Sequence, residues 1–238
     1  MNVVIDFGNS AAKVGIFDQH TLVQKMVFQE ETELKKFLQN FSTSHFIISS
    51  VSKEAQTILT WTNAKMKFVL THTLPVPVNI QYATPQTLGV DRLAAVCGAR
   101  HIFPDKNCLV IDAGTCITYE FIDKHGNYHG GAISPGLKMR FEAMHTFTAR
   151  LPLVNATDHP KFIGNSTESC MQSGVIYGVI DEMDGAISRY SGEFEDLQVI
   201  LCGGDTRFFE NKLKASIFAV PELVLSGLNS ILIYNVSR

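Results

Sequence analysis

The stretches Val4-Ile5-Asp6-Phe7-Gly8-Asn9 and Val110-Ile111-Asp112-Ala113-Gly114-Thr115 share one pattern, an apolar run followed by Asp-x-Gly and a small polar residue. A second apolar run follows each stretch, at residues 12–17 and 117–122. The pattern predicts a buried strand, a tight turn that glycine permits, and a returning strand. The carboxylate then stands at the exposed end of the first strand, where the following N–H groups and hydroxyls can face a phosphate.

The repetition predicts two similar α/β halves. In the first half we expect strands at residues 2–7, 12–18, 22–28, 45–51 and 67–70, and helices at 30–41, 54–64 and 88–101. In the second half we expect strands at 108–111, 117–122, 128–133 and 198–202, and helices at 167–190 and 221–234. The turn cluster Pro104-Asp105-Lys106-Asn107 separates domains at 1–105 and 106–238. Two such halves would place an acidic side chain on each wall of a cleft, which suits a metal-bound polyphosphate.

Composition narrows the class of protein. The chain has 238 residues and a net charge of −3 with no basic block, so nucleic acid is not an expected partner. No apolar run is long enough to span a membrane, and the N-terminus opens on a predicted strand rather than a signal peptide. The five cysteines form no CxxC pair, which favours reduced thiols in the cytoplasm over disulfides or a zinc site.

Polar residues near the two turns suit phosphate binding. Asn9, Ser10, Thr115 and Thr118 carry short hydroxyl or amide groups. Lys13 on the returning strand would neutralise phosphate charge, although a solvated surface lysine fits the spacing equally well.

The sequence Gly89-Val90-Asp91-Arg92 lies where a long loop enters a predicted helix. From spacing alone, a capping role for Asp91 is favoured, because a carboxylate at a helix N-terminus is stabilised by the helix dipole. The alternative makes Asp91 a base that orients an alcohol and accepts its proton. Arg92 would then bind an anionic group such as a carboxylate.

Two glycine-rich stretches lie at the ends of predicted strands. Gly130-Gly131-Ala132-Ile133-Ser134-Pro135-Gly136 indicates either close approach by a ligand or another backbone, or a bulge followed by a turn. Gly203-Gly204-Asp205 would let a nucleotide lie against bare backbone. The chain has no GxxxxGK[ST] loop, no GxGxxG after a strand and no hydrolase motif around its histidines.

Taken in order, these motifs resemble those of the type III pantothenate kinases, within the acetate and sugar kinase, Hsp70 and actin superfamily. They extend over nearly the whole chain, with Ser10 and Cys116 as mild departures from the usual residues. The matching stretches are Asp6 to Lys13, Tyr82 to Pro85, Gly89 to Arg92, Asp112 to Thr115, Gly130 to Gly136, Thr167 to Gly174, and Gly203 to Asp205.

The resemblance implies two actin-like (ribonuclease H-like) domains, with mixed sheets flanked by helices and a cleft between the domains. It implies ATP-dependent phosphorylation of pantothenate to 4'-phosphopantothenate, the first step of coenzyme A biosynthesis. It further implies a homodimer that requires Mg²⁺ and a monovalent cation, K⁺ or NH4⁺.

The resemblance also implies a role for each matching position. Asp91 would be the catalytic base, Asp6 would hold Mg²⁺, and Asp112 would hold the monovalent cation. The implied ATP-binding residues are Asp6, Phe7, Gly8, Asn9, Ser10, Ala11, Ala12, Lys13, Thr115, Gly203 and Gly204. The implied pantothenate-binding residues are Tyr82, Gly89, Val90, Asp91, Arg92 and Thr167.

Two other hypotheses fit the same motifs. One is a kinase of this superfamily that phosphorylates another small alcohol or a sugar. The other is a non-catalytic nucleotide-binding regulatory protein on the same scaffold, although the presence of Asp6, Asp91 and Asp112 disfavours it.

Overall fold

The computed structural model describes residues 1–8, 11–50 and 55–238. Groups of strands alternate with helices along this part of the chain. The strands are β1 (Asn2–Phe7), β2 (Ala12–Asp18), β3 (Thr21–Phe28), β4 (His45–Ser50), β5 (Met66–Val69), β6 (Asn79–Ile80), β7 (Cys108–Ala113), β8 (Cys116–Ile122), β9 (Asn127–Pro135), β10 (Gln198–Cys202) and β11 (Phe218–Ala219). The helices are α1 (Glu31–Asn40), α2 (Ala55–Leu59), α3 (Val90–Ile102), α4 (Leu137–Phe147), α5 (Thr167–Glu193), α6 (Thr206–Phe209) and α7 (Leu223–Val236), with a 3-10 turn at Pro85–Thr87.

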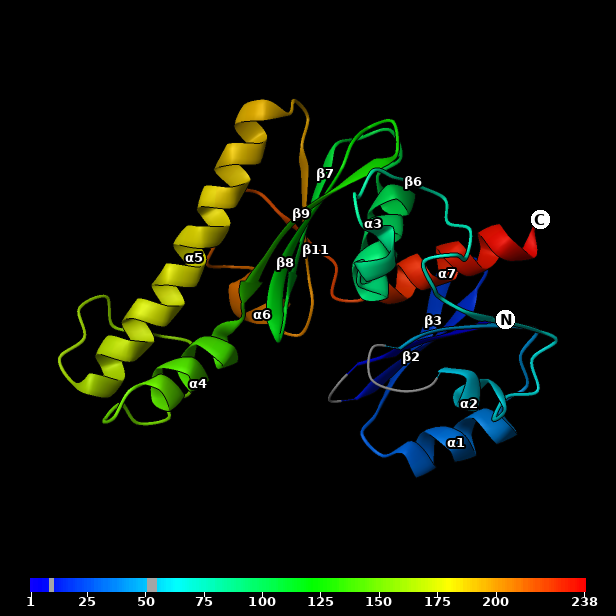
Figure 1. Ribbon diagram of the computed structural model, residues 1–238, viewed down its shortest axis with the longest axis horizontal. Coiled ribbons are helices and arrows are strands. Elements are labelled where there is room, and N and C mark those ends of the chain that lie inside the picture. Colours follow the sequence, from blue (N-terminus) through cyan, green and yellow to red (C-terminus); the bar gives the residue numbers. More distant parts are fainter. Residues whose placement is uncertain (9–10, 51–54) are drawn as a thin grey trace. The chain divides into compact units, whose positions relative to one another are not determined.

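The strands form two sheets that repeat one topology (Figure 1). The first sheet has the order β3-β2-β1-β4-β5, with β1 antiparallel to β2 and parallel to β4. The second has the order β9-β8-β7-β10-β11 when read from β9, and β6 is added beside β9. The two orders correspond strand for strand, which confirms the predicted duplication and the mixed α/β class.

The chain divides into two compact units whose composition differs from the predicted domains. Unit 1 contains Met1–Asp105, Ile122–His129 and Glu222–Arg238, and unit 2 contains Lys106–Phe121 and Gly130–Pro221. One division therefore coincides with the expected boundary after residue 105. The prediction of 106–238 as one continuous domain differs from this division, because the β8–β9 connection and α7 pack within unit 1.

Strand β1 of unit 1 is buried on both faces, which explains its continuous apolar run. Val3 and Ile5 belong to a core with Leu34 and Leu38 of α1. Val4, on the opposite face, is also fully buried. Helix α7 covers the sheet at β1 and β4 and packs most extensively on α3. Side chains alternate along a strand, so Asp6 shares the face of Val4, the face that α7 covers.

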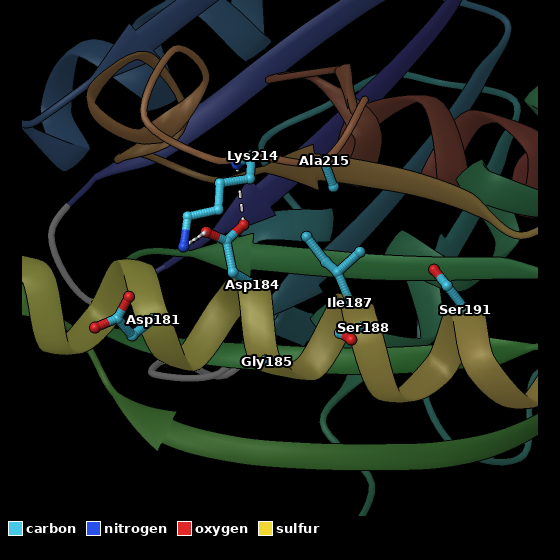
Figure 2. Close-up of a pocket in the computed structure, with 8 residues that line it drawn as sticks. All are labelled: Asp181, Asp184, Gly185, Ile187, Ser188, Ser191, Lys214 and Ala215. Atoms are coloured by element: carbon cyan, nitrogen blue, oxygen red, sulfur yellow. Dashed lines mark hydrogen bonds and ion pairs between the residues drawn. The ribbon is translucent and has the colours of Figure 1, made fainter.

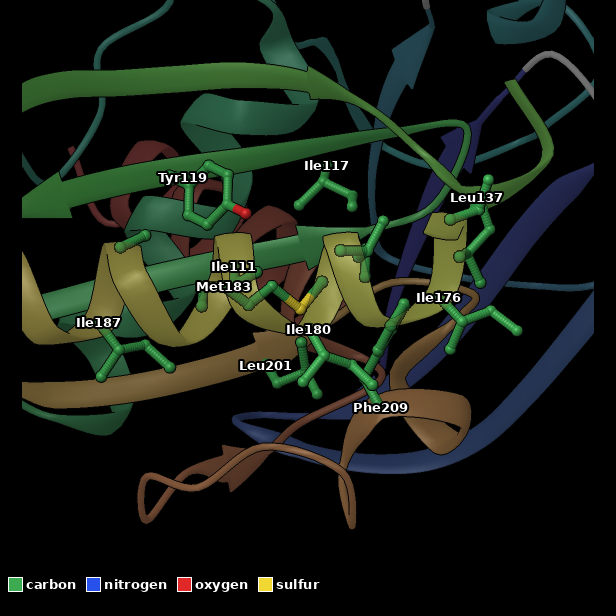
Figure 3. Packing of buried hydrophobic residues seen from close by; sticks show 14 of the residues in the cluster. Ile111, Ile117, Tyr119, Leu137, Ile176, Ile180, Met183, Ile187, Leu201 and Phe209 are labelled. Atoms are coloured by element: carbon green, nitrogen blue, oxygen red, sulfur yellow. The ribbon is translucent and has the colours of Figure 1, made fainter. Parts of the chain in front are cut away.

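The core of unit 2 lies between its sheet and the long helix α5 (Figure 3). Ile176, Ile180, Met183 and Ile187 of α5 pack against strand residues such as Ile111. The helix was predicted from Met171, Val175, Val179, Met183 and Ile187 at four-residue steps, and all five side chains are buried in this core. Ser166 caps α5 by accepting a hydrogen bond from the Ser169 N–H, within a capping box.

Several elements differ from the sequence predictions. Helix α4 was not expected, and residues 71–87, between the predicted strand at 67–70 and the predicted helix at 88–101, contain β6 and the 3-10 turn. Pro221 was predicted at the first helical position of the last helix, but α7 begins at Leu223 with Glu222 as N-cap. Residues 51 and 54, the predicted ends of a strand and a helix, lie outside the described residues. In the described parts of the chain, every helix is too short or too polar to cross a bilayer.

Close approach of α3 and α7 depends on two glycines. A Cβ at Gly227 of α7 would overlap the carbonyl oxygen of Ala94 on α3. In the same way, a Cβ at Gly98 of α3 would come too close to the carbonyl oxygen of Leu223 on α7. Because backbone cannot yield as a flexible side chain does, even a methyl group forces the two helices apart.

We predict that Gly227→Ala lowers the free energy of unfolding by about 1–3 kcal/mol, as overpacking of a filled interior does. Gly178→Ala is the matched control, because a Cβ there meets nothing within 4 Å on α5. That substitution is expected to be neutral or slightly stabilising, since alanine is the better helix former. Urea unfolding of both variants measures the difference, and equal midpoints would contradict the packing argument.

Candidate functional site

Asp6 is placed at the end of β1 by the pairing of three strands. In the register of the sheet, Asp6 lies beside Lys13 of β2 on one side and Ser49 of β4 on the other. Cross-strand neighbours point to the same face. The Ser49 Oγ donates a hydrogen bond of 3.2 Å to Asp6 Oδ1. Ser49 was not predicted as a site residue, and its only signal in the sequence is that it follows the apolar run of β4.

The surroundings of Asp6 disfavour a bare negative charge. Burial raises the pKa of the Asp6 carboxyl above its usual value. The Lys13 ammonium and the Ser49 hydrogen bond oppose this rise, while the nearby charge of Asp91 adds to it. Burial prevails over both stabilising neighbours. The site therefore holds a carboxylate that would gain from an additional cation.

Asp91 lies in the first turn of α3, near Asp6. Gly89 is the N-cap of this helix, and no side chain caps it. Asp91 Oδ1 instead accepts a hydrogen bond of 2.9 Å from the Arg92 N–H. A Cβ at Gly89 would lie 2.5 Å from the same oxygen, so glycine leaves room for the carboxylate to fold back. Asp91 is thus not the N-cap residue, although its charge still benefits from the helix dipole.

An aromatic stack lies beside the start of α3. The Arg92 guanidinium is 5.6 Å from the centre of the Tyr82 ring, within cation–π range. Tyr82 in turn stacks on the buried Tyr128, with ring centres 6.3 Å apart and planes inclined by 7°. Tyr128 was not among the residues predicted for the site. Strand β6 brings Tyr82 close to Tyr128, because its Ile80 pairs with Tyr128 of β9.

In unit 2, backbone contacts hold the turn after β7. The Asp205 N–H donates a hydrogen bond of 2.9 Å to the Ala113 carbonyl. Gly203 has a φ of +93°, and a Cβ there would overlap Asp112 Oδ1 and the Ala113 carbonyl oxygen. Position 203 therefore requires glycine, both for its positive φ and for the lack of space for a Cβ. Beside it, Gly204 is exposed and has open space around its Cα.

The glycine-rich stretch at residues 130–136 meets another backbone. A Cβ at Gly131 would overlap the Tyr119 carbonyl, and one at Gly136 would overlap the Gly114 carbonyl. The Gly136 N–H donates a hydrogen bond of 3.1 Å to the Thr115 carbonyl. Of the two alternatives, the structure shows close approach of neighbouring chain segments, with Thr115 itself exposed.

The remaining predicted residues lie within or beside these groups. Phe7 and Gly8 follow Asp6, and the Gly8 N–H donates to the Ala11 carbonyl at 3.2 Å. Ala12 begins β2 and Val90 begins α3, while the exposed Thr167 begins α5 in unit 2. Asn9 and Ser10, predicted to bind ATP, lie outside the described residues.

The carboxylates of Asp6 and Asp112 suit hard cations that take their remaining ligands from water and phosphate. In the part of the chain that the structure describes, no three His, Cys, Asp or Glu side chains gather to hold a metal. Mg²⁺ in a phosphate site takes one or two protein carboxylates and completes its shell with water and phosphate oxygens. The single carboxylate of Asp6 fits that requirement, and the Asp112 carboxylate is an oxygen donor of the same kind.

A separate depression of about 550 Å³ runs along α5 (Figure 2). Asp184 and Lys214 both line it: the Asp184 carboxylate accepts a 3.0 Å hydrogen bond from the Lys214 N–H and lies 3.9 Å from the Lys214 ammonium. Its lining includes none of the described residues predicted for the site. The predicted chemistry therefore does not belong to this depression.

The sequence of this chain matches those of known proteins over most of its length. The sequence profile of type III pantothenate kinases matches residues 2–189. A type III pantothenate kinase of Phocaeicola vulgatus is 46% identical, over 99% of this chain and 99% of its own length. The chain belongs to the type III pantothenate kinase family. The resemblance inferred from its motifs is thereby confirmed.

Solved structures confirm the fold expected of a type III pantothenate kinase. A Baf family protein of Campylobacter jejuni superimposes with a TM-score of 0.67 at 21% identity, covering 99% of this chain and 100% of its own. An ROK hexokinase of Thermus thermophilus has a TM-score of 0.50 at 10% identity, covering 100% and 99% of the chains. At such identities the likeness concerns the actin-like fold alone.

We predict that Asp6→Asn makes the protein more stable above neutral pH. The folded-state pKa of Asp6 is raised, so the protonated carboxyl favours folding, and this contribution is lost as the pH rises through that pKa. Asparagine stays neutral, and its advantage should therefore shrink in acid. Thermal unfolding between pH 4 and pH 9 measures the difference.

The matched control is Asp18→Asn, which changes an exposed carboxylate at the end of β2. It is expected to leave the pH profile of the melting temperature unchanged. An Asp6→Asn profile that runs parallel to the parent at every pH would contradict the electrostatic account.

Proposed function

We propose that this chain transfers the terminal phosphoryl group of ATP to the primary hydroxyl of pantothenate, giving 4'-phosphopantothenate at the first step of coenzyme A biosynthesis. Membership of the type III pantothenate kinase family supports the activity. The observation that supports the site is the placement of Asp6, Lys13, Ser49 and Asp91 around the end of β1.

In this proposal the nucleotide phosphates bind at the turns that follow β1 and β7. Residues 6–13, Thr115, Gly203 and Gly204 contact ATP. Lys13 neutralises phosphate charge beside Asp6, and the bare backbone at Gly204 allows close approach. Phosphoryl transfer passes through a loose transition state with charge spread over its oxygens. Positioning and charge neutralisation therefore supply most of the rate enhancement.

Asp91 acts on the acceptor. An aliphatic alcohol is too weak an acid to ionise beforehand, so the Asp91 carboxylate first accepts a hydrogen bond from the hydroxyl and orients its oxygen. As the O–P bond forms, the proton moves to Asp91. The carboxylate is held for this role by Arg92 N–H at the start of α3. Tyr82, Gly89, Val90, Arg92 and Thr167 bind the rest of pantothenate, with Arg92 suited to its carboxylate.

Two cations complete the proposed site. Asp6 would hold Mg²⁺ through water, and Asp112 would hold K⁺ or NH4⁺. When bound, these ions neutralise negative charge on the nucleotide phosphates. We also propose a homodimer, whose mass light scattering in solution would measure. A monomer at micromolar concentration would contradict the dimer without affecting the activity.

Release of ADP on addition of pantothenate tests the activity. The purified protein is expected to release ADP with pantothenate and to remain inactive with hexoses. Hexose-dependent release would favour the sugar kinase hypothesis. Nucleotide binding without turnover on either acceptor would favour the non-catalytic alternative.

We predict that Asp91→Asn lowers kcat about 10²-fold or more, because the amide cannot accept the proton. Folding and nucleotide binding should be retained, since asparagine keeps the shape of the side chain. Asp105→Asn is the matched control, because the Asp105 side chain is 84% exposed and forms its ion pair with Arg100, 3.1 Å away. Turnover of Asp91→Asn close to that of this control would remove Asp91 as base.

Activation by monovalent cations is expected to depend on Asp112. Potassium or ammonium should raise turnover of the parent, whereas sodium should not. In Asp112→Asn, the concentration of potassium that gives half-activation should rise about tenfold or more, because a charged ligand is lost. Initial rates across a potassium titration measure this shift. Equal rates with and without potassium in the parent protein would rule out the cation role.

A further inference from the structure

A charged pair joins the two helices of unit 2 that follow β9. Arg140 of α4 places Nη2 2.5 Å from Glu182 Oε2 on α5, and their side chains are only 22% and 29% exposed. Two hydroxyl groups complete the shell of the carboxylate. Tyr119 donates to Glu182 Oε1 at 2.8 Å, and Ser134 donates to Oε2 at 3.0 Å. Each carboxylate oxygen thus has a neutral hydroxyl donor, and one also has the guanidinium.

The network keeps Glu182 ionised. Burial alone would raise the pKa of the Glu182 carboxyl, but hydrogen bonds from Arg140, Tyr119 and Ser134 outweigh it and lower the pKa below its usual value. A partly buried ion pair is a weak source of stability, since apolar residues would hold the two helices together equally well. What an apolar pair cannot provide is directional hydrogen bonding to the neighbouring chain.

Arg140 provides that directional bonding. Its Nε donates to the Pro135 carbonyl at 2.8 Å, and its Nη2 donates to Ser134 Oγ at 2.8 Å. The guanidinium therefore fixes both a side chain and a backbone carbonyl at the end of β9. Because Glu182 faces the same guanidinium, it sets the plane in which these bonds point.

Residues 134–136, which begin with the two residues that Arg140 holds, contact the turn that follows β7. Gly136, the residue after Pro135, donates its N–H to the Thr115 carbonyl at 3.1 Å and approaches the Gly114 carbonyl too closely to allow a Cβ. The Gly114 N–H donates to the Cys116 carbonyl at 3.0 Å within the same turn. Displacement of residues 134–136 would therefore displace Gly114 and Thr115.

We propose that Glu182, acting through Arg140, is a positioning residue that holds the Gly114-Thr115 turn in the conformation that binds ATP. This inference rests on the proposed function, in which Thr115 contacts ATP. Glu182 touches no substrate. It acts through Arg140 and Gly136 on the nucleotide, whereas Thr167, the proposed pantothenate-binding residue on the same helix, begins α5 about four turns before Glu182.

Steady-state kinetics of Glu182→Gln test the proposal, with ATP and pantothenate varied in turn. The amide keeps the size of the side chain but removes the charge that orients the guanidinium. We expect KM for ATP to rise about tenfold, with KM for pantothenate within about twofold of the parent. Binding of a fluorescent ATP analogue should weaken by the same factor. Unchanged constants for ATP, or equal rises for both substrates, would overturn the proposal.

Two further variants separate positioning from folding. Tyr119→Phe removes one hydroxyl donor from Glu182 without changing the ring, and should show the same selective rise for ATP on a smaller scale, about twofold to fourfold. If Glu182→Gln does not fold, the result for Tyr119→Phe decides, and absence of the selective rise overturns the inference. Glu142→Gln is the matched control on α4, where Glu142 pairs with Lys138 at 3.6 Å in solvent, and it should leave both KM values unchanged.

Failure of the proposed function gives a different result. In that case the parent protein itself would show no pantothenate-dependent release of ADP. An active parent with an unaltered Glu182→Gln variant would leave the activity in place and remove only the role of Glu182.

Discussion

A carboxylate at the end of a strand buried on both faces is the constraint on which the site depends. Val3, Val4 and Ile5 are all fully buried, so β1 cannot shift its register without exposing core residues. The next residue, Asp6, is therefore held where the sheet ends, between Lys13 and Ser49 and near the start of α3. Burial raises the pKa of the Asp6 carboxyl because it disfavours the charged form. A bound cation would offset that unfavourable charge, which suits the position to binding phosphate together with a cation.

The second copy of the pattern reaches the same arrangement by other means. In the first sheet, the strand parallel to β1 supplies the Ser49 hydroxyl beside Asp6. In the second sheet, Cys202 of β10 lies beside Asp112, and the chain turns at once into Gly203, where only a hydrogen atom fits against the Asp112 side chain. A side chain thus supports the first turn, and backbone supports the second. The Glu182 network adds a further support to the second turn through Gly136.

Local patterns predicted most of the fold, and contacts between distant segments account for what they missed. Apolar runs located the strands of the first sheet and those of the second except the short β6 and β11, and the apolar residues at four-residue steps located α5, the longest helix. The sequence could not show that α7 joins unit 1, because that depends on Gly98 and Gly227 meeting opposite backbones. Ser49 and Tyr128 were missed for the same reason, since each acts through a strand pairing far away in sequence. The roles of Asp6, Asp91 and Asp112 came from resemblance to the family and remain proposals.

The protonation of Asp6 provides the most direct test of the account. A titration of the side-chain carboxyl carbon by NMR, on protein labelled at aspartate and assigned with Asp6→Asn, measures its pKa with and without ATP and Mg²⁺. The account predicts a pKa above the usual aspartate value in the free protein, because of burial, and a clear fall when the nucleotide and metal bind. An ordinary pKa that stays the same on binding would contradict the claim that this buried carboxylate is the anchor of the nucleotide site.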